Sequence, residues 1–145
     1  MVRIISGNVN KICANMVQLK IIMDIQLNKI GQTSYLACRA RARQLVMMRL
    51  RIYKEAYQKS FVRVSIKDMR SRWGSCSSKK NLNFNYRVLF LPIELVDYII
   101  VHELCHLEEM NHSKRFWRLV SQTIPKYRHL ILTLRRLERQ MFLKK

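Results

Sequence analysis

The stretch HELCH at residues 102–106, followed by a third histidine at residue 112, determines the fold that we expect for this chain. Residues four apart on an α-helix lie one turn above each other on the same face, so His102 and His106 can offer two imidazoles to one ion. Glu103 projects about 100° further round the helix. The pattern predicts half of a zinc site.

This helix is predicted to run from about Pro92 to Met110. Proline suits a first helical position, and Glu94 and Asp97 suit the positive end of the helix dipole. When residues are placed at about 100° intervals, polar side chains fill one narrow stripe and apolar side chains cover most of the rest. In such a buried helix an ionised carboxylate and two imidazoles are costly, unless a divalent cation with its bound water satisfies them.

His112 can join the other two histidines only if the helix ends before it. Ten residues of continuous helix would carry His112 about 15 Å past His102, whereas a zinc–nitrogen bond is about 2 Å long. The chain must therefore turn back, and we expect Asn111 in a left-handed conformation and Ser113 as the N-cap of the next helix. The histidine spacing equals that of the metzincin pattern, but Glu109 stands where that pattern has glycine, which weakens a metzincin assignment.

A less specific interpretation is that an isolated HExxH arises by chance and that a lone histidine on a helix belongs to the core or the surface. The third histidine, the buried face and the break after Met110 favour the metal interpretation. Cys105 could be imagined as a further ligand, but a small buried side chain is the simpler role for it. The sequence therefore predicts zinc at His102, His106 and His112.

The charge of the chain is large and uneven. Its 28 lysines and arginines against nine acidic residues give a formal net charge of +19, and a field of this size attracts polyanions such as nucleic acid or nucleotides. Residues 92–112 nevertheless contain no lysine or arginine and hold five of the nine acidic residues. An alternative interpretation is that a cation site excludes nearby cations while the other basic residues form ordinary solvated faces.

Length and composition indicate the class of protein. A chain of 145 residues is about one domain, large enough for a real core. It has no apolar run of about 18 residues, which predicts no membrane span, and its N-terminus has no signal-peptide pattern. Four scattered cysteines without a CxxC pair are typical of a reduced, cytoplasmic protein.

Hydrophobic periodicity predicts an α+β fold in which a small, mainly antiparallel sheet between Phe61 and Phe90 packs on the metal helix, with basic helices before and after. Residues 1–34 follow neither period for long and are left unassigned, so the domain is expected at residues 35–145. The first basic helix is expected to bury a stripe that includes Met48 and Ile52. This first helix is expected at residues 35–58, and two more helices are expected at residues 113–123 and 127–141. The strands are expected at residues 61–67, 70–77 and 82–88, and the last two strands form a hairpin.

Two segments follow each other in a fixed order, RSRWGSCSSKKNLNFNYRVLFLP at residues 70–92 and IELVDYIIVHELCHLEEMNHSKRFW at residues 93–117. Together they resemble the YgjP-like metallopeptidases, which are relatives of the SprT-like zinc proteins. The likeness is continuous from about Asp68 to Trp117 and looser from Tyr35 to Leu137. It implies a zincin-like fold, zinc on the three histidines, Glu103 as the catalytic acid/base, and a bacterial-type cytoplasmic protein.

Two positions depart from the family pattern. Family members usually carry a longer, β-rich N-terminal part, which residues 1–34 do not resemble, so the resemblance implies that this part is truncated or divergent here. Tyr86 stands where a tryptophan is common in the family, so an aromatic side chain is kept.

The candidate residues together suit hydrolysis. Three neutral imidazoles leave a fourth zinc position for water, whose pKa falls towards 7 on the metal, and Glu103 can take the proton of that water. An edge strand can hold an extended polypeptide through backbone hydrogen bonds, so Arg72, Trp73 and Tyr86 on the hairpin are candidate substrate contacts. Trp73 suits a core position equally well. We therefore predict a zinc-dependent metallopeptidase.

Two alternatives remain open from the residues alone. Activated water also attacks phosphoryl centres, so the basic surround of the site suits a metal-dependent phosphohydrolase that releases pyrophosphate from nucleoside triphosphates. The other alternative is a basic nucleic-acid-binding module with a structural zinc ion, which would bind DNA with a steep salt dependence. That alternative leaves Glu103 without a role.

Overall fold

The computed structural model of this chain describes residues 32–57 and 60–142. Most of the N-terminal segment that the sequence left unassigned lies outside these residues. None of the helices in the described part is long and apolar enough to cross a membrane. The elements in chain order are α3 (Gln32–Lys54), β1 (Arg63–Lys67), β2 (Gly74–Cys76), β3 (Asn81–Asn85), the 3-10 helix η1 (Tyr86–Phe90), α4 (Ile93–Cys105), α5 (Lys114–Thr123) and α6 (Tyr127–Phe142).

The three strands form one mixed sheet in the order β1-β3-β2. The predicted hairpin of β2 and β3 is present and antiparallel, and Lys80 in its turn has a positive φ of 57°. β1 pairs in parallel with β3, so that Arg63 lies opposite Asn81 and Lys67 opposite Asn85. The predicted α+β class is confirmed, but one of the two pairings is parallel because the second strand of the hairpin, rather than the first, lies beside β1.

Asn85 ends β3 and shapes the loop before β2. It is fully buried, and its side-chain oxygen accepts a hydrogen bond from the backbone amide of Arg87, which caps η1. Strand β3 therefore ends three residues earlier than the predicted residue 88. The Asn85 amide nitrogen donates to the carbonyl oxygens of Met69 and Arg72, at 2.7 and 3.0 Å. These bonds tie the chain that enters β2 to the core.

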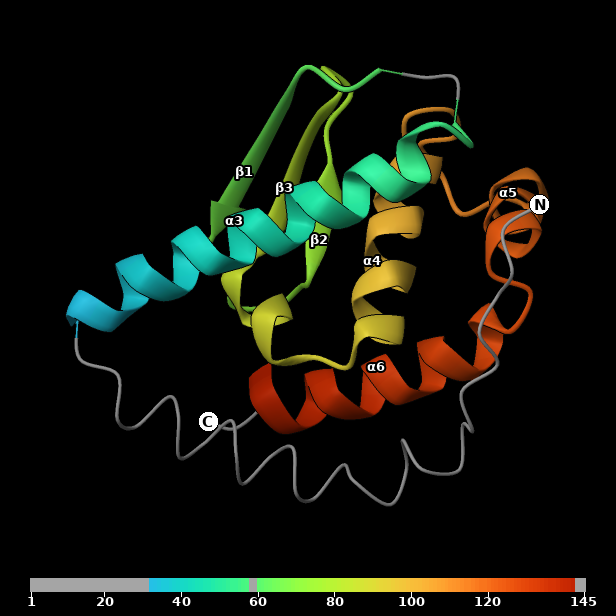
Figure 1. The fold of residues 1–145 in the computed structure, drawn as a ribbon. Helices are drawn as coiled ribbons and strands as arrows, with labels where there is room; N and C mark the ends of the chain where they lie inside the picture. The colour runs from blue at the N-terminus through green and yellow to red at the C-terminus, as the bar shows by residue number, and fades with distance from the viewer. Residues whose placement is uncertain (1–31, 58–59, 143–145) are drawn as a thin grey trace.

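Helix α4 is the centre of the molecule (Figure 1), and it packs against α3, α5, α6 and β2. Its start directly after Pro92 agrees with the prediction, and most of its side chains are buried as expected. It ends at Cys105, five residues before the predicted end at Met110, because the last bonds tighten: the amides of Leu107 and Glu108 reach carbonyls only three residues back. The chain therefore turns back earlier than the sequence indicated.

Helix α3 covers the sheet edge and is joined to α4. Arg49 donates two hydrogen bonds of 2.6 Å to the two carboxylate oxygens of Asp97 on α4. Arg39 and Arg43 donate to the carbonyl oxygens of Ile66 and Val64, at 3.2 and 3.0 Å, along the outer edge of β1.

The buried stripe of α3 differs from the predicted one, because the helix turns a different face towards α4 and the sheet. Met48 and Ile52 are 52% and 49% exposed. Cys38 and Ala42 are buried, as the expected stripe has them, and Val46 and Leu50 are buried in place of Met48 and Ile52.

Candidate metal centre

The three histidines of the predicted site lie together at the end of α4. Nε2 of His102 is 3.2 Å from Nε2 of His106 and 3.0 Å from Nε2 of His112. The candidate ligand atoms of the three residues all lie within 4.8 Å of one another. Two nitrogen atoms bound to one tetrahedral zinc ion at about 2 Å are separated by about 3.3 Å. The spacing of the triad therefore fits a shared ion.

The chain reversal after α4 brings His112 to the other two rings. Ser113 caps α5 as predicted, since its side-chain oxygen accepts a hydrogen bond of 3.3 Å from the amide of Phe116. The prediction for Asn111 is wrong, because Lys80 is the sole non-glycine residue with positive φ in the described part of the chain. Asn111 instead accepts a hydrogen bond from the Ser113 amide through its side chain. Trp117 then stacks on the ring of His112, at 5.6 Å and 27°.

His102 and His106 each have a hydrogen-bond partner at Nδ1, the ring nitrogen that faces away from the other histidines. His106 Nδ1 is 3.0 Å from the carbonyl oxygen of Glu109, and because a carbonyl only accepts, the proton of this ring is on Nδ1 and the lone pair is on Nε2. His102 Nδ1 is 3.2 Å from the hydroxyl of Tyr98. Burial lowers the pKa of His102 to about 3, with the charges of His106 and His112 adding to the effect, and burial also lowers the pKa of His106. Both rings are therefore neutral at pH 7, which is the state that binds metal.

Glu103 lies beside the triad in an unusual environment for a carboxylate. It is 5% exposed, and its Oε2 atom has no hydrogen-bond partner among the described residues. Burial raises the pKa of Glu103 to about 8, an effect that the nearby charge of Arg72 opposes. A bound cation would favour the ionised carboxylate. The neutral imidazoles and the unpaired buried carboxylate therefore fit a site for a zinc ion.

Strand β2 approaches Glu103 closely. A Cβ atom at Gly74 would lie 2.6 Å from Oε1 of Glu103 and 2.9 Å from its Cγ and Cδ atoms. Glycine therefore lets the strand lie directly against the carboxylate. The strand and the last turns of α4 together enclose the acid beside the histidines.

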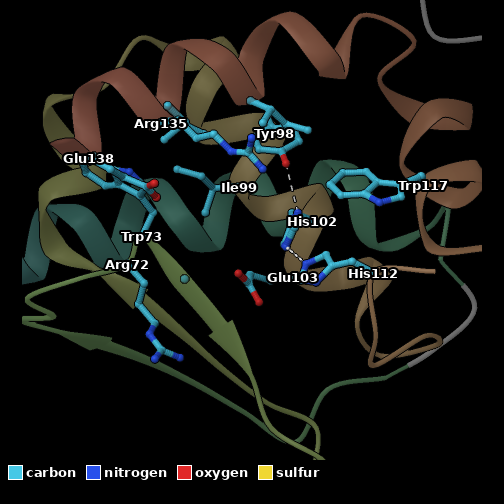
Figure 2. A pocket seen from close by; sticks show the side chains of 13 residues that line it. Arg72, Trp73, Tyr98, Ile99, His102, Glu103, His112, Trp117, Arg135 and Glu138 are labelled. Carbon is cyan, nitrogen blue, oxygen red and sulfur yellow. Dashed lines mark hydrogen bonds between the residues drawn. The ribbon is translucent and has the colours of Figure 1, made fainter. Parts of the chain in front are cut away.

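A cavity of about 450 Å³ opens beside His102, Glu103 and His112 (Figure 2). Its walls combine apolar and aromatic side chains from α4, α5, α6 and the start of β2 with charged groups. The apolar and aromatic lining residues are Trp73, Tyr98, Ile99, Trp117, Ile131 and Leu134, and the charged ones apart from Glu103 are Arg72, Arg135 and Glu138. The cavity is thus an apolar recess with charged groups, next to the candidate metal site.

Two of the three predicted substrate contacts line this cavity. Arg72 and Trp73 do so, but Trp73 is only 4% exposed and also belongs to the hydrophobic core, the alternative position given for it. Tyr86 is not among the described residues that line the cavity. Tyr86 lies at the start of η1, 7% exposed, with the guanidinium of Arg87 4.6 Å from its ring centroid.

The sequence reasoning missed Tyr98 and the part of the cavity that α6 forms. Tyr98 precedes His102 by four residues, so helical spacing alone could have placed it on the same face. The contribution of Ile131, Leu134, Arg135 and Glu138 depends on how α6 packs across α4, and no local pattern reports that.

The fold and the site define a class, the zincin-like metallopeptidases, and comparison with solved structures agrees. The metallopeptidase zymogen of abylysin from Pyrococcus abyssi is 27% identical, with a TM-score of 0.52, and the match covers 68% of this chain and 93% of that one. The metallopeptidase zymogen of jannalysin from Methanocaldococcus jannaschii is 26% identical, with a TM-score of 0.52, and the match covers 66% of this chain and 94% of that one.

The chain belongs to the YgjP-like family, because the family's metallopeptidase domain matches residues 8–137. This confirms the resemblance carried by residues 70–117, and the match begins inside the segment that the sequence left unassigned. A search of curated proteins gave no significant match.

Proposed function

We propose that this protein is a zinc-dependent peptidase in which His102, His106 and His112 hold the metal and Glu103 is the catalytic base. The observation that carries the proposal is the buried, unpaired carboxylate of Glu103 beside three converging Nε2 atoms, at the wall of an open cavity. Membership of a metallopeptidase family supports a polypeptide as the substrate.

In the proposed hydrolysis the three histidines and Glu103 have different roles. A zinc ion at the triad would supply a Lewis acid that acidifies water and polarises the scissile carbonyl group. The Glu103 carboxylate accepts the proton of the attacking water and passes it to the leaving amine, a role for which general acid–base catalysis is worth about 10²- to 10⁴-fold in rate. Its close contact with β2 limits the positions that this carboxylate can take.

Strand β2 could also bind the polypeptide substrate. β2 is an edge strand of the sheet and borders the cavity through Gly74. An extended polypeptide can pair with such an edge through backbone hydrogen bonds while alternate side chains enter pockets. The apolar wall of Trp73, Ile131 and Leu134 would then receive a substrate side chain, and Arg72 would lie beside the bound chain.

The deciding experiment compares Glu103→Gln with Glu108→Gln, a glutamate of the same segment that is exposed and paired with Arg115 at 3.0 Å. Each variant is loaded with zinc, its metal content is measured, and cleavage of an unfolded polypeptide is followed. We expect Glu103→Gln to bind zinc normally and to lose at least about 100-fold in kcat. Glu108→Gln should stay within about twofold of the wild type, as expected for a surface substitution.

Two results would overturn the assignment. Equal rates of cleavage by the two variants would show that Glu103 is not the catalytic base. Release of pyrophosphate from nucleoside triphosphates that Glu103→Gln abolishes, with no polypeptide cleaved by the wild type, would replace the peptidase by the phosphohydrolase.

A further inference from the structure

We propose that Tyr98 is a positioning residue that fixes the proton of His102 on Nδ1 and so directs the Nε2 lone pair of this ring to the metal. The inference rests on the proposed metal site and goes beyond it. It assigns a role to a residue that is neither a ligand nor the base.

The geometry places the two side chains in a single helical turn. Tyr98 and His102 are four residues apart on α4, the tyrosine oxygen lies 3.2 Å from His102 Nδ1, and the ring centroids are 5.7 Å apart at 63°. Tyr98 is 6% exposed, so the hydroxyl is fixed within the wall of the cavity. Figure 2 shows the hydroxyl directed at the side of the imidazole that faces away from His112.

Counting donors and acceptors gives the direction of this hydrogen bond. A neutral imidazole carries one proton, on either Nδ1 or Nε2. If His102 Nε2 is to share an ion with the Nε2 atoms of His106 and His112, its proton must be on Nδ1, and the Tyr98 oxygen must accept it. The hydroxyl proton of Tyr98 then has to point away from the imidazole ring. The hydroxyl thus accepts the Nδ1 proton of the tautomer that the metal site needs.

His102 depends on this contact more than His106 does. The partner of His106 is a backbone carbonyl, which no side-chain substitution removes. The partner of His102 is a side-chain hydroxyl, so Tyr98→Phe removes it and leaves every ligand in place. Loss of such an outer hydrogen bond typically weakens metal binding about 10- to 100-fold.

The test measures zinc affinity by competition with a chromophoric chelator, for Tyr98→Phe and for Tyr57→Phe. Tyr57 is a matched control, because it is also buried and its hydroxyl contacts the Thr123 hydroxyl at 2.7 Å and the Cys105 thiol at 3.6 Å rather than a histidine. We expect Tyr98→Phe to raise the zinc Kd about 10- to 100-fold and Tyr57→Phe to leave it unchanged. Both variants lose one buried hydroxyl, so thermal unfolding of the metal-free proteins shows the structural cost common to both.

A second measurement uses the wild type alone and does not depend on the folding of any variant. In the zinc-loaded protein, ¹⁵N NMR of the imidazole rings should show His102 protonated on Nδ1. Protonation on Nε2, or an equal zinc Kd for the two phenylalanine variants, would overturn the role of Tyr98 while leaving the metal site intact. Failure of the wild type to bind zinc would overturn the metal site as well.

Discussion

Replacing Gly74 by alanine tests how closely strand β2 controls the proposed catalytic base. The added Cβ would lie 2.6 Å from Oε1 of Glu103, about 0.8 Å short of an ordinary contact at 3.4 Å. The backbone itself accepts alanine, since no described glycine has positive φ. The carboxylate or the strand must therefore move by close to an ångström, and a displacement of about 1 Å at a reacting group costs about 100-fold in rate.

The expected result is a loss of about 100-fold in kcat/KM with zinc affinity unchanged, because the three atoms nearest to the new methyl group all belong to Glu103. Overpacking should also lower the free energy of unfolding by about 1–3 kcal/mol, so activity is measured well below the unfolding temperature. The control is Ser75→Ala in the same strand, whose hydroxyl accepts a hydrogen bond of 3.2 Å from Asn83. A neighbouring residue in a strand points to the other face, so this variant should keep most of its activity.

The reasoning fails if Gly74→Ala cleaves polypeptide as fast as Ser75→Ala does while Glu103→Gln is inactive. The carboxylate would then be needed but free to move, and its contact with β2 would not position it. A parallel loss of zinc affinity would instead mean that the methyl group disturbs the triad.

Two further predictions concern the scaffold. Asp97→Asn should lower the free energy of unfolding by about 1.5–3 kcal/mol, since Arg49 loses its paired charge-assisted bonds. Calorimetry should show an unfolding midpoint lower by roughly 5–10 °C. A shift within about 1 °C would show that the ion pair is not stabilising. Asn85→Ala should lower the free energy of unfolding, measured with urea, by about 2–4 kcal/mol, because two loop carbonyls lose their donor. It should also lower kcat/KM by loosening the loop that carries Trp73. Unchanged urea midpoint and kcat/KM would contradict the anchoring role of Asn85.

The convergence of the three histidines could be predicted from the sequence because it depends on local geometry. The spacing of His102 and His106 is a property of any α-helix, and the need for a chain reversal before His112 follows from the helical rise. The conformation of the reversal was not predictable in the same way. Asn111 can serve a turn either through a left-handed backbone or through its side chain, and composition does not distinguish the two.

The sheet was harder to predict because strand periodicity reports faces and not neighbours. The alternation of apolar and polar residues in the segments of β1 and β3 predicts one buried face, and Val64, Ile66, Leu82 and Phe84 on it are buried, although Val62, which has the same spacing, is 76% exposed. It contained no information on which strand lies beside which, so the parallel pairing of β1 with β3 was missed. The second half of the α3 face, with Met48 and Ile52, was misplaced for a related reason, since apolar residues occur on more than one side of that helix and packing selects among them.

The contacts between α3 and β1 also affect how the sheet can grow. Val64 and Ile66 are two residues apart, so their carbonyl oxygens point to the same side, and the guanidinium groups of Arg43 and Arg39 already occupy them. A foreign strand that approached from there would have to displace both arginines, which is one way in which proteins prevent aggregation through exposed strands. Among the described strands, the opposite margin at β2 is therefore the favoured place for a guest chain, and a guest bound there would lie next to the histidines.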